Sequence, residues 1–449
     1  MPFPKEFHFG VCSAAYQVEG AIHEGDKLPS IWDVYSHTPG KIKNGENGDI
    51  AIDFYHRYKE DIVLAKELGV DTFRFSLAWT RLVKQDGSTN EAGVKFYRQV
   101  LEEIHRQGLR PVITLYHWDL PQYLEDRGGW KERNIIDDFL TYVRVAKENF
   151  LDLCQDYLTF NEPQCFLYLG YQNLGHAPGK VYTFEEMMRA AHNVLMCHFK
   201  AQRLLEEGHP EVHVGFVNTM NGVIPEDDSV ALWEEIKKHF FATPKTAQDF
   251  YTQSIYMDPL YLHHYPKEVE EYMEEHHILQ PGDLDLIRNG KEDTVYLNLY
   301  TANHCYVDKK GLYHSERRPT KENQGFLEWL IKEPETLYYT PKLIQERYHL
   351  PIVISENGDA VEDILTPDGH IHDPRRSEYL LSYLGEMEKA IQDGVDIRGY
   401  FYWSLCDNFE WAEGFGPRFG LVYIDYKNGL KRIKKDSFTS YQTFIKEHH

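Results

Sequence analysis

Two short apolar stretches of the sequence each end in a glutamate, and paired carboxyl groups can cleave a glycosidic bond. Glu356 closes the stretch 350–356 and is followed by Asn-Gly, while Glu162 closes the stretch 156–162 and is followed by Pro. Short apolar runs bounded by chain-breaking residues indicate buried strands, so both glutamates are expected at strand ends. Glycoside cleavage needs one carboxyl that holds a proton for the leaving group and one that attacks while ionised. For either residue alone, the alternative is a solvated strand-end glutamate paired with an arginine.

The residues around both glutamates resemble the two signatures of the family 1 glycoside hydrolases. Thr-Phe-Asn-Glu-Pro occupies 159–163, and Ile-Ser-Glu-Asn-Gly occupies 354–358, in the order and at the separation of that family. The resemblance extends from Phe7 to about Tyr441, which is nearly the whole chain. It implies a glycosidase that retains the anomeric configuration, with its two carboxyl groups about 5–5.5 Å apart.

The resemblance also implies a set of five catalytic residues. Glu356 is the expected nucleophile and Glu162 the expected general acid and base. Arg74, which lies among apolar residues, either satisfies buried carbonyls or faces Glu356 and lowers the pKa of that carboxyl, and the resemblance favours the second. Asn298 would also favour the ionised nucleophile, and Tyr300 matches the tyrosine that orients it. Once Glu356 is charged, it would raise the pKa of Glu162, which then keeps its proton.

Aromatic and hydrogen-bonding side chains form the sugar site that the resemblance implies. Gln17 is expected to bind two hydroxyls through one amide, Asn161 to bind the sugar 2-hydroxyl, and Trp329 to form a platform for the aglycone. A satisfied core histidine is the alternative for His117, and a helix with core aromatics is the alternative for 409–411. The expected substrate-binding residues are Gln17, His117, Trp118, Asn161, Trp329, Trp403, Glu410, Trp411 and Phe419.

Strand and helix signals alternate along the chain and predict the frame that positions these residues. Helices are expected at 58–68, 91–107, about 135–149, 185–206, about 341–348 and 376–392. Strands are expected at 7–15, 71–77, 111–121, 156–162, 213–218, 294–301, 350–358 and 397–404. Eight strands with chemistry at their carboxyl ends fit an α/β fold, a single (β/α)₈ barrel domain over 1–449 with long βα-loop insertions.

One alternative fold and one long insertion remain to be tested. A doubly wound open sheet also alternates strands and helices, but the sequence holds no Gly-x-Gly-x-x-Gly and no P-loop to support it. Residues 219–294 read as a long, irregular insertion after the fifth strand, with helical pieces such as 245–256, and are expected to help wall the cleft.

Charge and cysteine usage narrow the class of protein. A formal net charge of −23 argues against nucleic acid and against anionic membrane surfaces as partners. The six cysteines form no C-x-x-C, and the sequence shows neither an apolar leader nor a long apolar run, so a cytoplasmic protein with reduced cysteines is expected. The histidines are scattered without H-E-x-x-H, and neither a metal nor a cofactor is expected. The oligomeric state is not fixed by the sequence.

The sequence is consistent with three functions. The first is a β-glucosidase acting on terminal non-reducing β-D-glucosyl, and possibly galactosyl or fucosyl, residues of small glycosides such as cellobiose. The second is a 6-phospho-β-glycosidase, which in this family binds phosphate with a Ser, a Lys and a Tyr; Glu410, Pro417 and Phe419 stand there instead. Arg418 could bind phosphate only if its side chain turned into the site. The third is a non-catalytic sugar-binding relative, which would be expected to lack one of the two glutamates.

Overall fold

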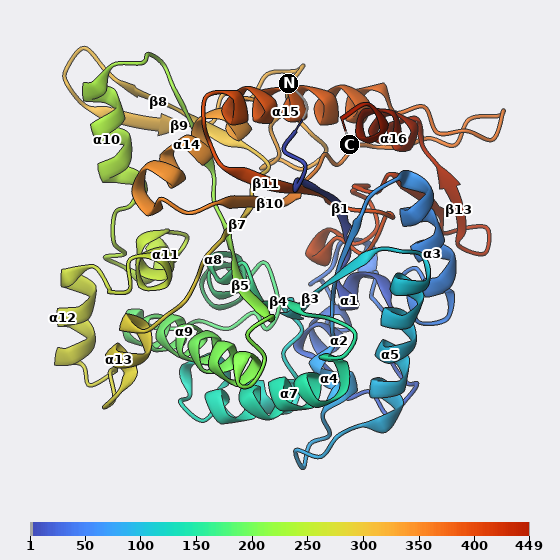
Figure 1. Ribbon diagram of the computed structural model, residues 1–449, viewed down its shortest axis with the longest axis horizontal. Coiled ribbons are helices and arrows are strands. Elements are labelled where there is room, and N and C mark those ends of the chain that lie inside the picture. Colours follow the sequence, from blue (N-terminus) through green and yellow to red (C-terminus); the bar gives the residue numbers. More distant parts are fainter. Residues whose placement is uncertain (1–2, 449) are drawn as a thin grey trace.

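The computed structural model describes residues 3–448, in which eight parallel strands close into a barrel surrounded by helices (Figure 1). Neighbouring strands follow the order β1-β11-β10-β7-β5-β4-β3-β2, and β1 pairs with both β11 and β2. The barrel strands are β1 His8–Cys12, β2 Thr72–Ser76, β3 Arg110–Tyr116, β4 Asp156–Asn161, β5 His213–Thr219, β7 Val295–Asn298, β10 Ile352–Asn357 and β11 Ile397–Tyr402. The closed barrel confirms the (β/α)₈ prediction, and the doubly wound alternative is wrong.

Amphipathic helices cover the outside of the barrel, and local sequence sets their ends. The Asn90 side chain caps the helix that begins at Glu91 by accepting from the Ala92 N–H, and Thr183 and Glu186 cap the helix that begins at Phe184 reciprocally. Gly69, with φ of 92°, ends a third. These helices are α3 Phe54–Leu68, α5 Glu91–Arg106, α7 Ile135–Phe150, α9 Phe184–Glu206, α14 Thr336–Tyr348, α15 Pro374–Gln392 and α16 Asp436–His448. Within residues 3–448 no helix combines the length and apolar character needed to cross a membrane.

The inside of the barrel has its own small apolar layer. Val112, Leu158 and Val217 pack there against Tyr296, while the adjacent residue Ile113 belongs to the main core between strands and helices. This alternation follows from the two-residue period of a strand. The inner layer fills the barrel below the site, so the polar side chains of the site lie above it, at the carboxyl ends of the strands.

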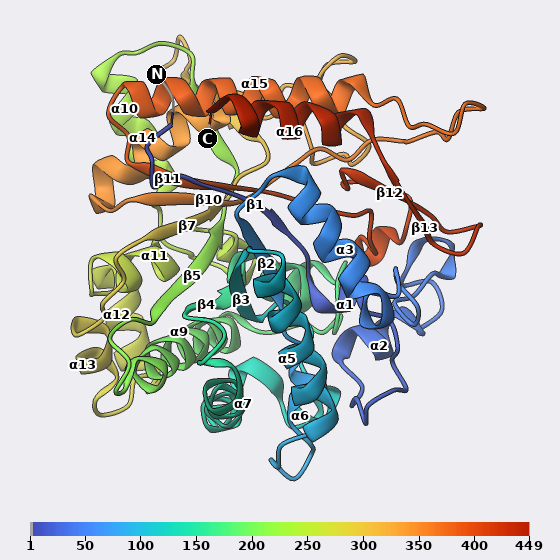
Figure 2. The ribbon, with the colours of Figure 1, turned by 45° about the vertical axis from the view of Figure 1, so that its right-hand side comes forward.

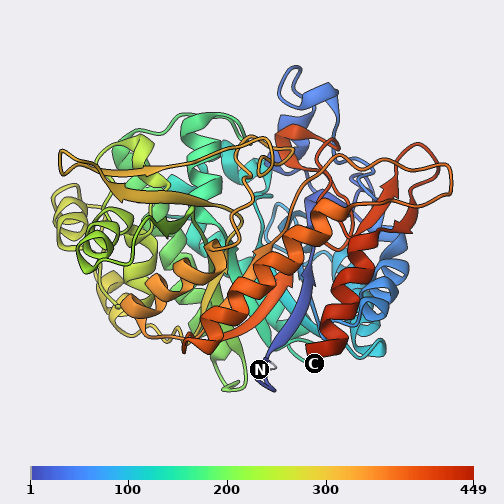
Figure 3. The same ribbon diagram turned by 90° about the horizontal axis from the view of Figure 1, so that it is seen from above.

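The loops at the carboxyl ends of the strands are long and carry additional structure (Figure 3). A three-stranded sheet is formed by β6 Gly222–Pro225, β8 Ala302–Val307 and β9 Tyr313–Glu316. A hairpin of β12 Val422–Asp425 and β13 Lys431–Lys434 follows β11, and α16 then lies beside α15 (Figures 1 and 2). Short helices α1 Ala15–Val18, α2 Ile31–Ser36, α4 Trp79–Leu82, α6 Gln122–Asp126 and α8 Pro163–Tyr168 lie in other loops of this end.

The region 219–294 is more regular than predicted. About half of it is helical, with α10 Val230–Phe240, α11 Ser254–Tyr261, α12 Lys267–Glu275 and α13 Asp283–Arg288. The expected helix at 245–256 is a 3₁₀ turn at 247–250 followed by the start of α11. Much of it covers the side of the barrel, because Asp283 of α13 accepts from His192 of α9 at 2.8 Å. The predicted helix at about 341–348 is also longer than expected, since α14 begins at Thr336 and contains Pro341.

Candidate active site

Both glutamates lie at the carboxyl end of the barrel, on strands separated by two others. Glu162 directly follows β4 and precedes Pro163, the first residue of α8, while Glu356 is the penultimate residue of β10. Both side chains are almost completely buried. Glu162 has φ of 52°, in the left-handed region that few residues other than glycine adopt. Backbone strain of this kind is typical of functional sites that the surrounding structure holds in place.

Glu356 is held by one cation and one hydroxyl. Its Oε1 accepts from Arg74 Nη1 at 2.7 Å, and its Oε2 accepts from the Tyr300 hydroxyl at 2.7 Å. The Arg74 contact bears out the predicted placement. Arg74 lowers the pKa of Glu356 as predicted, and so does Tyr300, but burial outweighs both contacts and the net pKa of Glu356 is raised. Desolvation of a carboxylate this deep in the barrel outweighs a single cation.

Glu162 has no cation in contact. Its Oε1 accepts from Asn298 Nδ2 at 2.6 Å. Burial, reinforced by the charge of Glu356, raises the pKa of Glu162 to about 8. The pair therefore consists of one carboxyl with an arginine and a tyrosine hydroxyl as donors, and one with only neutral neighbours, the Asn298 amide and the Cys165 thiol.

Neutral polar residues orient this pair. Arg74 Nη2 and Asn298 Nδ2 donate to Asn161 Oδ1 at 2.7 and 3.1 Å. Ser355 Oγ donates to Asn298 Oδ1 at 2.8 Å, and Arg74 Nε donates to Thr114 Oγ1 at 3.0 Å. The sequence reasoning missed Thr114 and Ser355 as positioning residues. Both are small polar residues inside otherwise apolar strands, which is the signal that could have identified them.

Four aromatic residues predicted at the sugar site lie together. The Trp411 ring stacks on Trp118 with centroids 4.7 Å apart, and the His117 ring lies 5.6 Å from Trp403 and 6.1 Å from Trp411. Trp118 Nε1 donates to the Asn161 carbonyl at 2.9 Å. The Nε2 of the buried His117 accepts from Asn161 Nδ2 at 3.2 Å, and its Nδ1 has no protein partner.

Gln17 and Glu410 meet at the other side of these rings. Gln17 Nε2 donates to the Phe409 carbonyl at 2.9 Å, to Asn408 Oδ1 at 3.1 Å and to Glu410 Oε2 at 3.5 Å. The amide nitrogen is thus occupied by protein, and only the unpartnered Oε1 is left to accept from a ligand, which corrects the expected use of the whole amide. Burial, with the charges of Glu356 and Glu162, raises the pKa of Glu410 to about 8. Asn408 was not predicted, although it lies in the same motif.

The two remaining predicted residues border Tyr300. The Phe419 ring is buried and meets the Tyr300 ring edge-on at 6.2 Å. Trp329 meets the same ring at 5.7 Å, and 36% of Trp329 is exposed. Trp329 therefore borders solvent where Phe419 does not. All fourteen predicted site residues lie at the carboxyl end of the barrel or in its loops.

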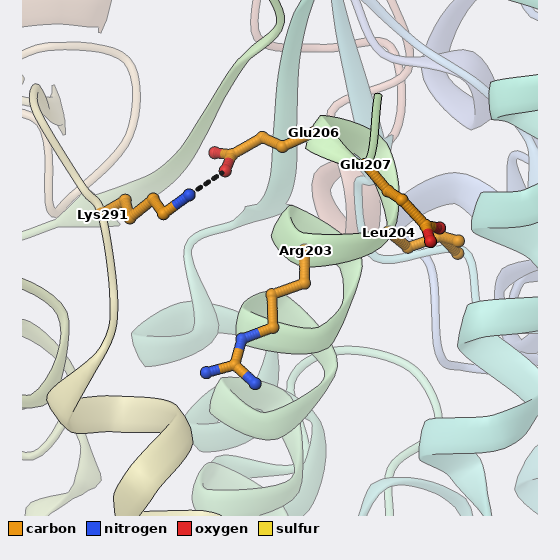
Figure 4. A pocket seen from close by; sticks show the side chains of 5 residues that line it. All are labelled: Arg203, Leu204, Glu206, Glu207 and Lys291. Carbon is orange, nitrogen blue, oxygen red and sulfur yellow. Dashed lines mark hydrogen bonds and ion pairs between the residues drawn. The ribbon is translucent and has the colours of Figure 1, made fainter. Parts of the chain in front are cut away.

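A surface hollow elsewhere offers no comparable chemistry. It is formed at the carboxyl end of α9 by Arg203, Leu204, Glu206, Glu207 and Lys291 (Figure 4). Glu206 and Lys291 form an ion pair of 3.4 Å there, and the Lys291 side chain is 71% exposed. The hollow lies at the amino ends of β5 and β7, opposite the glutamates. An exposed ion pair at this end of a barrel stabilises little and suggests no reaction.

Known proteins share the sequence and the fold along the whole chain. The family described as Glycosyl hydrolase family 1 matches residues 1–449. Beta-glucosidase A of Thermotoga maritima is 37% identical over 99% of this chain and 98% of its own length. A bifunctional beta-D-glucosidase/beta-D-fucosidase of Bifidobacterium breve is 36% identical, covering 100% of this chain and 99% of the relative. The structure of the Thermotoga maritima beta-glucosidase in complex with deoxynojirimycin superposes with a TM-score of 0.86 at 36% identity, over 100% of this chain and 99% of that one.

Proposed function

The chain belongs to glycosyl hydrolase family 1 and is therefore a glycoside hydrolase acting on small-molecule glycosides; we propose that it is a retaining β-glucosidase. The observation that carries this proposal is the unequal pair of buried carboxyl groups at the carboxyl ends of β4 and β10. Glu356 has the contacts that stabilise a carboxylate, and Glu162 has the environment that keeps a proton. The relatives with beta-glucosidase activity support the choice of glucosides.

In the first step, Glu356 attacks the anomeric carbon and the glycosidic bond breaks. Of the two carboxyls, Glu356 ionises first, because only it accepts from Arg74 and Tyr300. The leaving oxygen takes the proton of Glu162, which resides on Oε2 because Oε1 accepts from Asn298. The products are a neutral aglycone alcohol and a sugar bonded covalently to Glu356.

In the second step, Glu162 becomes the base. With the Glu356 charge consumed in the ester, the repulsion that raised the pKa of Glu162 is removed, so the carboxylate is stable until water arrives. It takes one proton from that water, whose oxygen bonds to the anomeric carbon as the ester bond breaks. Two inversions leave the configuration unchanged.

The glycone site favours an unmodified hexose. Gln17 Oε1 and His117 Nδ1 are buried polar atoms without protein partners, as expected for groups that bind sugar hydroxyls. Arg418 does not turn into the site, since its Nη1 donates to Asp407 at 2.6 Å and its guanidinium lies 4.0 Å from the Tyr423 ring centroid. Because Glu410 holds a proton below a pKa of about 8, the case against a 6-phosphate depends on the lack of a free cation there more than on repulsion.

The proposal also covers which glycosides the protein accepts and the cell compartment in which it acts. The glucosidase/fucosidase relative supports activity on fucosides as well as glucosides, and cellobiose is the proposed natural type of substrate. The cysteines are free thiols, which suits a reducing compartment such as the cytoplasm. A single domain over 1–449 is part of the same proposal.

Proton NMR of the first sugar formed from p-nitrophenyl β-glucoside tests the reaction. Initial β-glucose is the expected product, and initial α-glucose would refute the retaining mechanism. A panel of p-nitrophenyl β-glucoside, galactoside, fucoside and glucoside 6-phosphate tests the substrate. We expect the glucoside to have the highest or joint highest kcat/KM, and a preference for the 6-phosphate would refute the proposed glycone.

A further inference from the structure

One loop at the barrel mouth, residues 408–419, carries three of the proposed sugar-binding residues, and we call it the subsite loop. Its ends are joined by main-chain hydrogen bonds from Leu421 to Ser404 at 3.1 Å and from Asp407 to Val422 at 3.0 Å. The approach at Gly420 is so close that an added Cβ would lie 2.1 Å from the Asp407 nitrogen. Residues 404–407 and 420–422 therefore lie close together at the base of the loop, and we call these two segments the neck. The Asp407 side chain lies between them.

The Asp407 carboxylate is fully buried and accepts four hydrogen bonds. Its Oδ1 accepts from the Gly420 N–H at 3.0 Å and from Lys435 Nζ at 2.7 Å. Its Oδ2 accepts from Arg418 Nη1 at 2.6 Å and from the Ile424 N–H at 3.3 Å. The donors lie at the end of the subsite loop, in β12 and in the segment after β13. One carboxylate at the start of the loop thus holds three later parts of the chain.

The two cations continue into a larger buried cluster. Lys435 Nζ also donates to Asp363, and Arg376 donates to both oxygens of Asp363 at 3.2 and 2.9 Å. Arg376 donates further to Asp373 and, at 2.6 Å, to the Arg418 carbonyl. Three cations balance three carboxylates with almost no water access. Loss of one member leaves an uncompensated buried charge, so the arrangement is specific.

The subsite loop is also tied to α1 by Gln17, whose Nε2 donates to the Phe409 carbonyl at 2.9 Å, to Asn408 Oδ1 at 3.1 Å and to Glu410 Oε2 at 3.5 Å. The Phe409 N–H donates to the Gln17 carbonyl at 3.1 Å, and the Phe415 N–H donates to Glu46 Oε2 at 2.6 Å. Glu410 itself is tied within the loop, by its N–H to the Gly414 carbonyl at 2.8 Å. The position of the Glu410 carboxyl relative to the barrel therefore depends on two anchors, Gln17 on one side and the neck that holds both ends of the loop on the other.

We propose that Asp407, held by Lys435, is a positioning residue for the sugar subsite: it places the subsite loop so that Glu410 meets the hydroxyls at the C4 and C6 side of the sugar. This inference rests on the proposed glucosidase function. It assigns a role in substrate selectivity to a side chain, Lys435, that lies outside the barrel strands and their substrate-facing loops. Asp407 and Lys435 act through Glu410 and do not touch the sugar.

Lys435→Met removes the cation and keeps the aliphatic stem. The assay compares kcat/KM on p-nitrophenyl β-glucoside with that on the β-xyloside, which lacks the C6 hydroxymethyl group. We expect the glucoside value to fall about fivefold, the effect of one misplaced hydrogen bond to a neutral group, mainly through KM, and the xyloside value to fall much less. In a Glu410→Gln background the same substitution should change the glucoside value less than about twofold, because its effect passes through Glu410.

Two further variants separate positioning from plain destabilisation. Lys435→Arg should restore most of the glucoside selectivity. Arg347→Met is the matched control, because Arg347 donates to the buried Asp258 at 3.1 and 2.7 Å on the side of the barrel covered by α11 and α14. It should lower the Tm without changing the glucoside-to-xyloside ratio. If Lys435→Met does not fold, Arg418→Met, at a side chain 14% exposed, takes its place.

Two outcomes would overturn the positioning role. One is an equal loss of kcat/KM on the glucoside and the xyloside in Lys435→Met. The other is a double variant whose loss is the product of the two single losses, because the two residues would then act independently. Binding of deoxynojirimycin by calorimetry gives a readout that needs no turnover. Lys435→Met should raise the Kd for deoxynojirimycin, while Arg347→Met should leave this Kd unchanged. An unchanged Kd in Lys435→Met would also overturn the inference. A wild-type protein that hydrolyses neither glycoside would refute the proposed function, and the calorimetry would still decide the role of Lys435.

Discussion

Tyr300→Phe isolates one hydrogen bond to the proposed nucleophile. The Tyr300 hydroxyl donates to Glu356 Oε2 at 2.7 Å, and the ring contacts with Trp329 and Phe419 are kept by phenylalanine. A hydrogen bond to a buried charged group contributes about 1.5–3 kcal/mol, which corresponds to about 1–2 pKa units. Because the hydroxyl stabilises the ionised carboxylate, its loss raises the pKa of Glu356 further above its ordinary value.

The pH profile of kcat/KM on p-nitrophenyl β-glucoside measures this shift. Activity requires ionised Glu356, so the acid limb should move to higher pH by about 1–2 units, and the value at the optimum should fall about 10- to 100-fold. Tyr348→Phe is the control, since that hydroxyl donates to the buried carboxylate of Asp258 at 2.8 Å away from the site. It should leave the profile unchanged. An acid limb that stays in place in Tyr300→Phe, or moves to lower pH, would refute the assignment of Glu356.

Two further substitutions test the roles of the pair. Glu356→Ala should lower turnover of glucosides by more than about 10³-fold while the circular dichroism spectrum stays unchanged. Added azide should restore some turnover and give an α-glycosyl azide. Near-normal activity without azide would contradict the nucleophile role. Glu162→Gln should remove the basic limb of the pH profile, since in the wild type the active protonated form is lost as pH rises through the pKa of about 8. The substitution should lower kcat/KM less on dinitrophenyl glucosides than on alkyl glucosides. Equal losses of kcat/KM on the two kinds of glucoside would contradict the acid role.

The barrel and its chemical centre could be predicted because their signals are local. Each barrel strand is a short buried run, and its end is marked by a turn residue or a polar side chain, as at Glu162 and Glu356. Arg74 stood out for the same reason, as a charge inside an apolar strand. The resemblance to a family then gave roles that residue types alone left open.

The remaining features depend on tertiary contacts that no short stretch specifies. The region 219–294 forms helices because its apolar side chains pack against α9 and α14. Packing against neighbouring elements also allows α14 to continue through Pro341, against the local propensity of proline. The donor side of the Gln17 amide is used by Phe409 and Asn408, nearly 400 positions away. The net pKa of Glu356 depends on burial, which only the closed barrel provides.

Closure of the barrel by β1 and β11 has a consequence for synthesis of the protein. His8 pairs with Gly399, and Lys435, which anchors the subsite loop, lies beyond both. During translation the first strand must therefore wait, with one edge unpaired, until nearly the whole chain has been made. Contacts this distant in sequence form slowly, and an exposed strand edge can pair with another chain. We expect the nascent chain to need protection from aggregation until β11 has been made, and the sugar site to be completed only after Lys435 has left the ribosome.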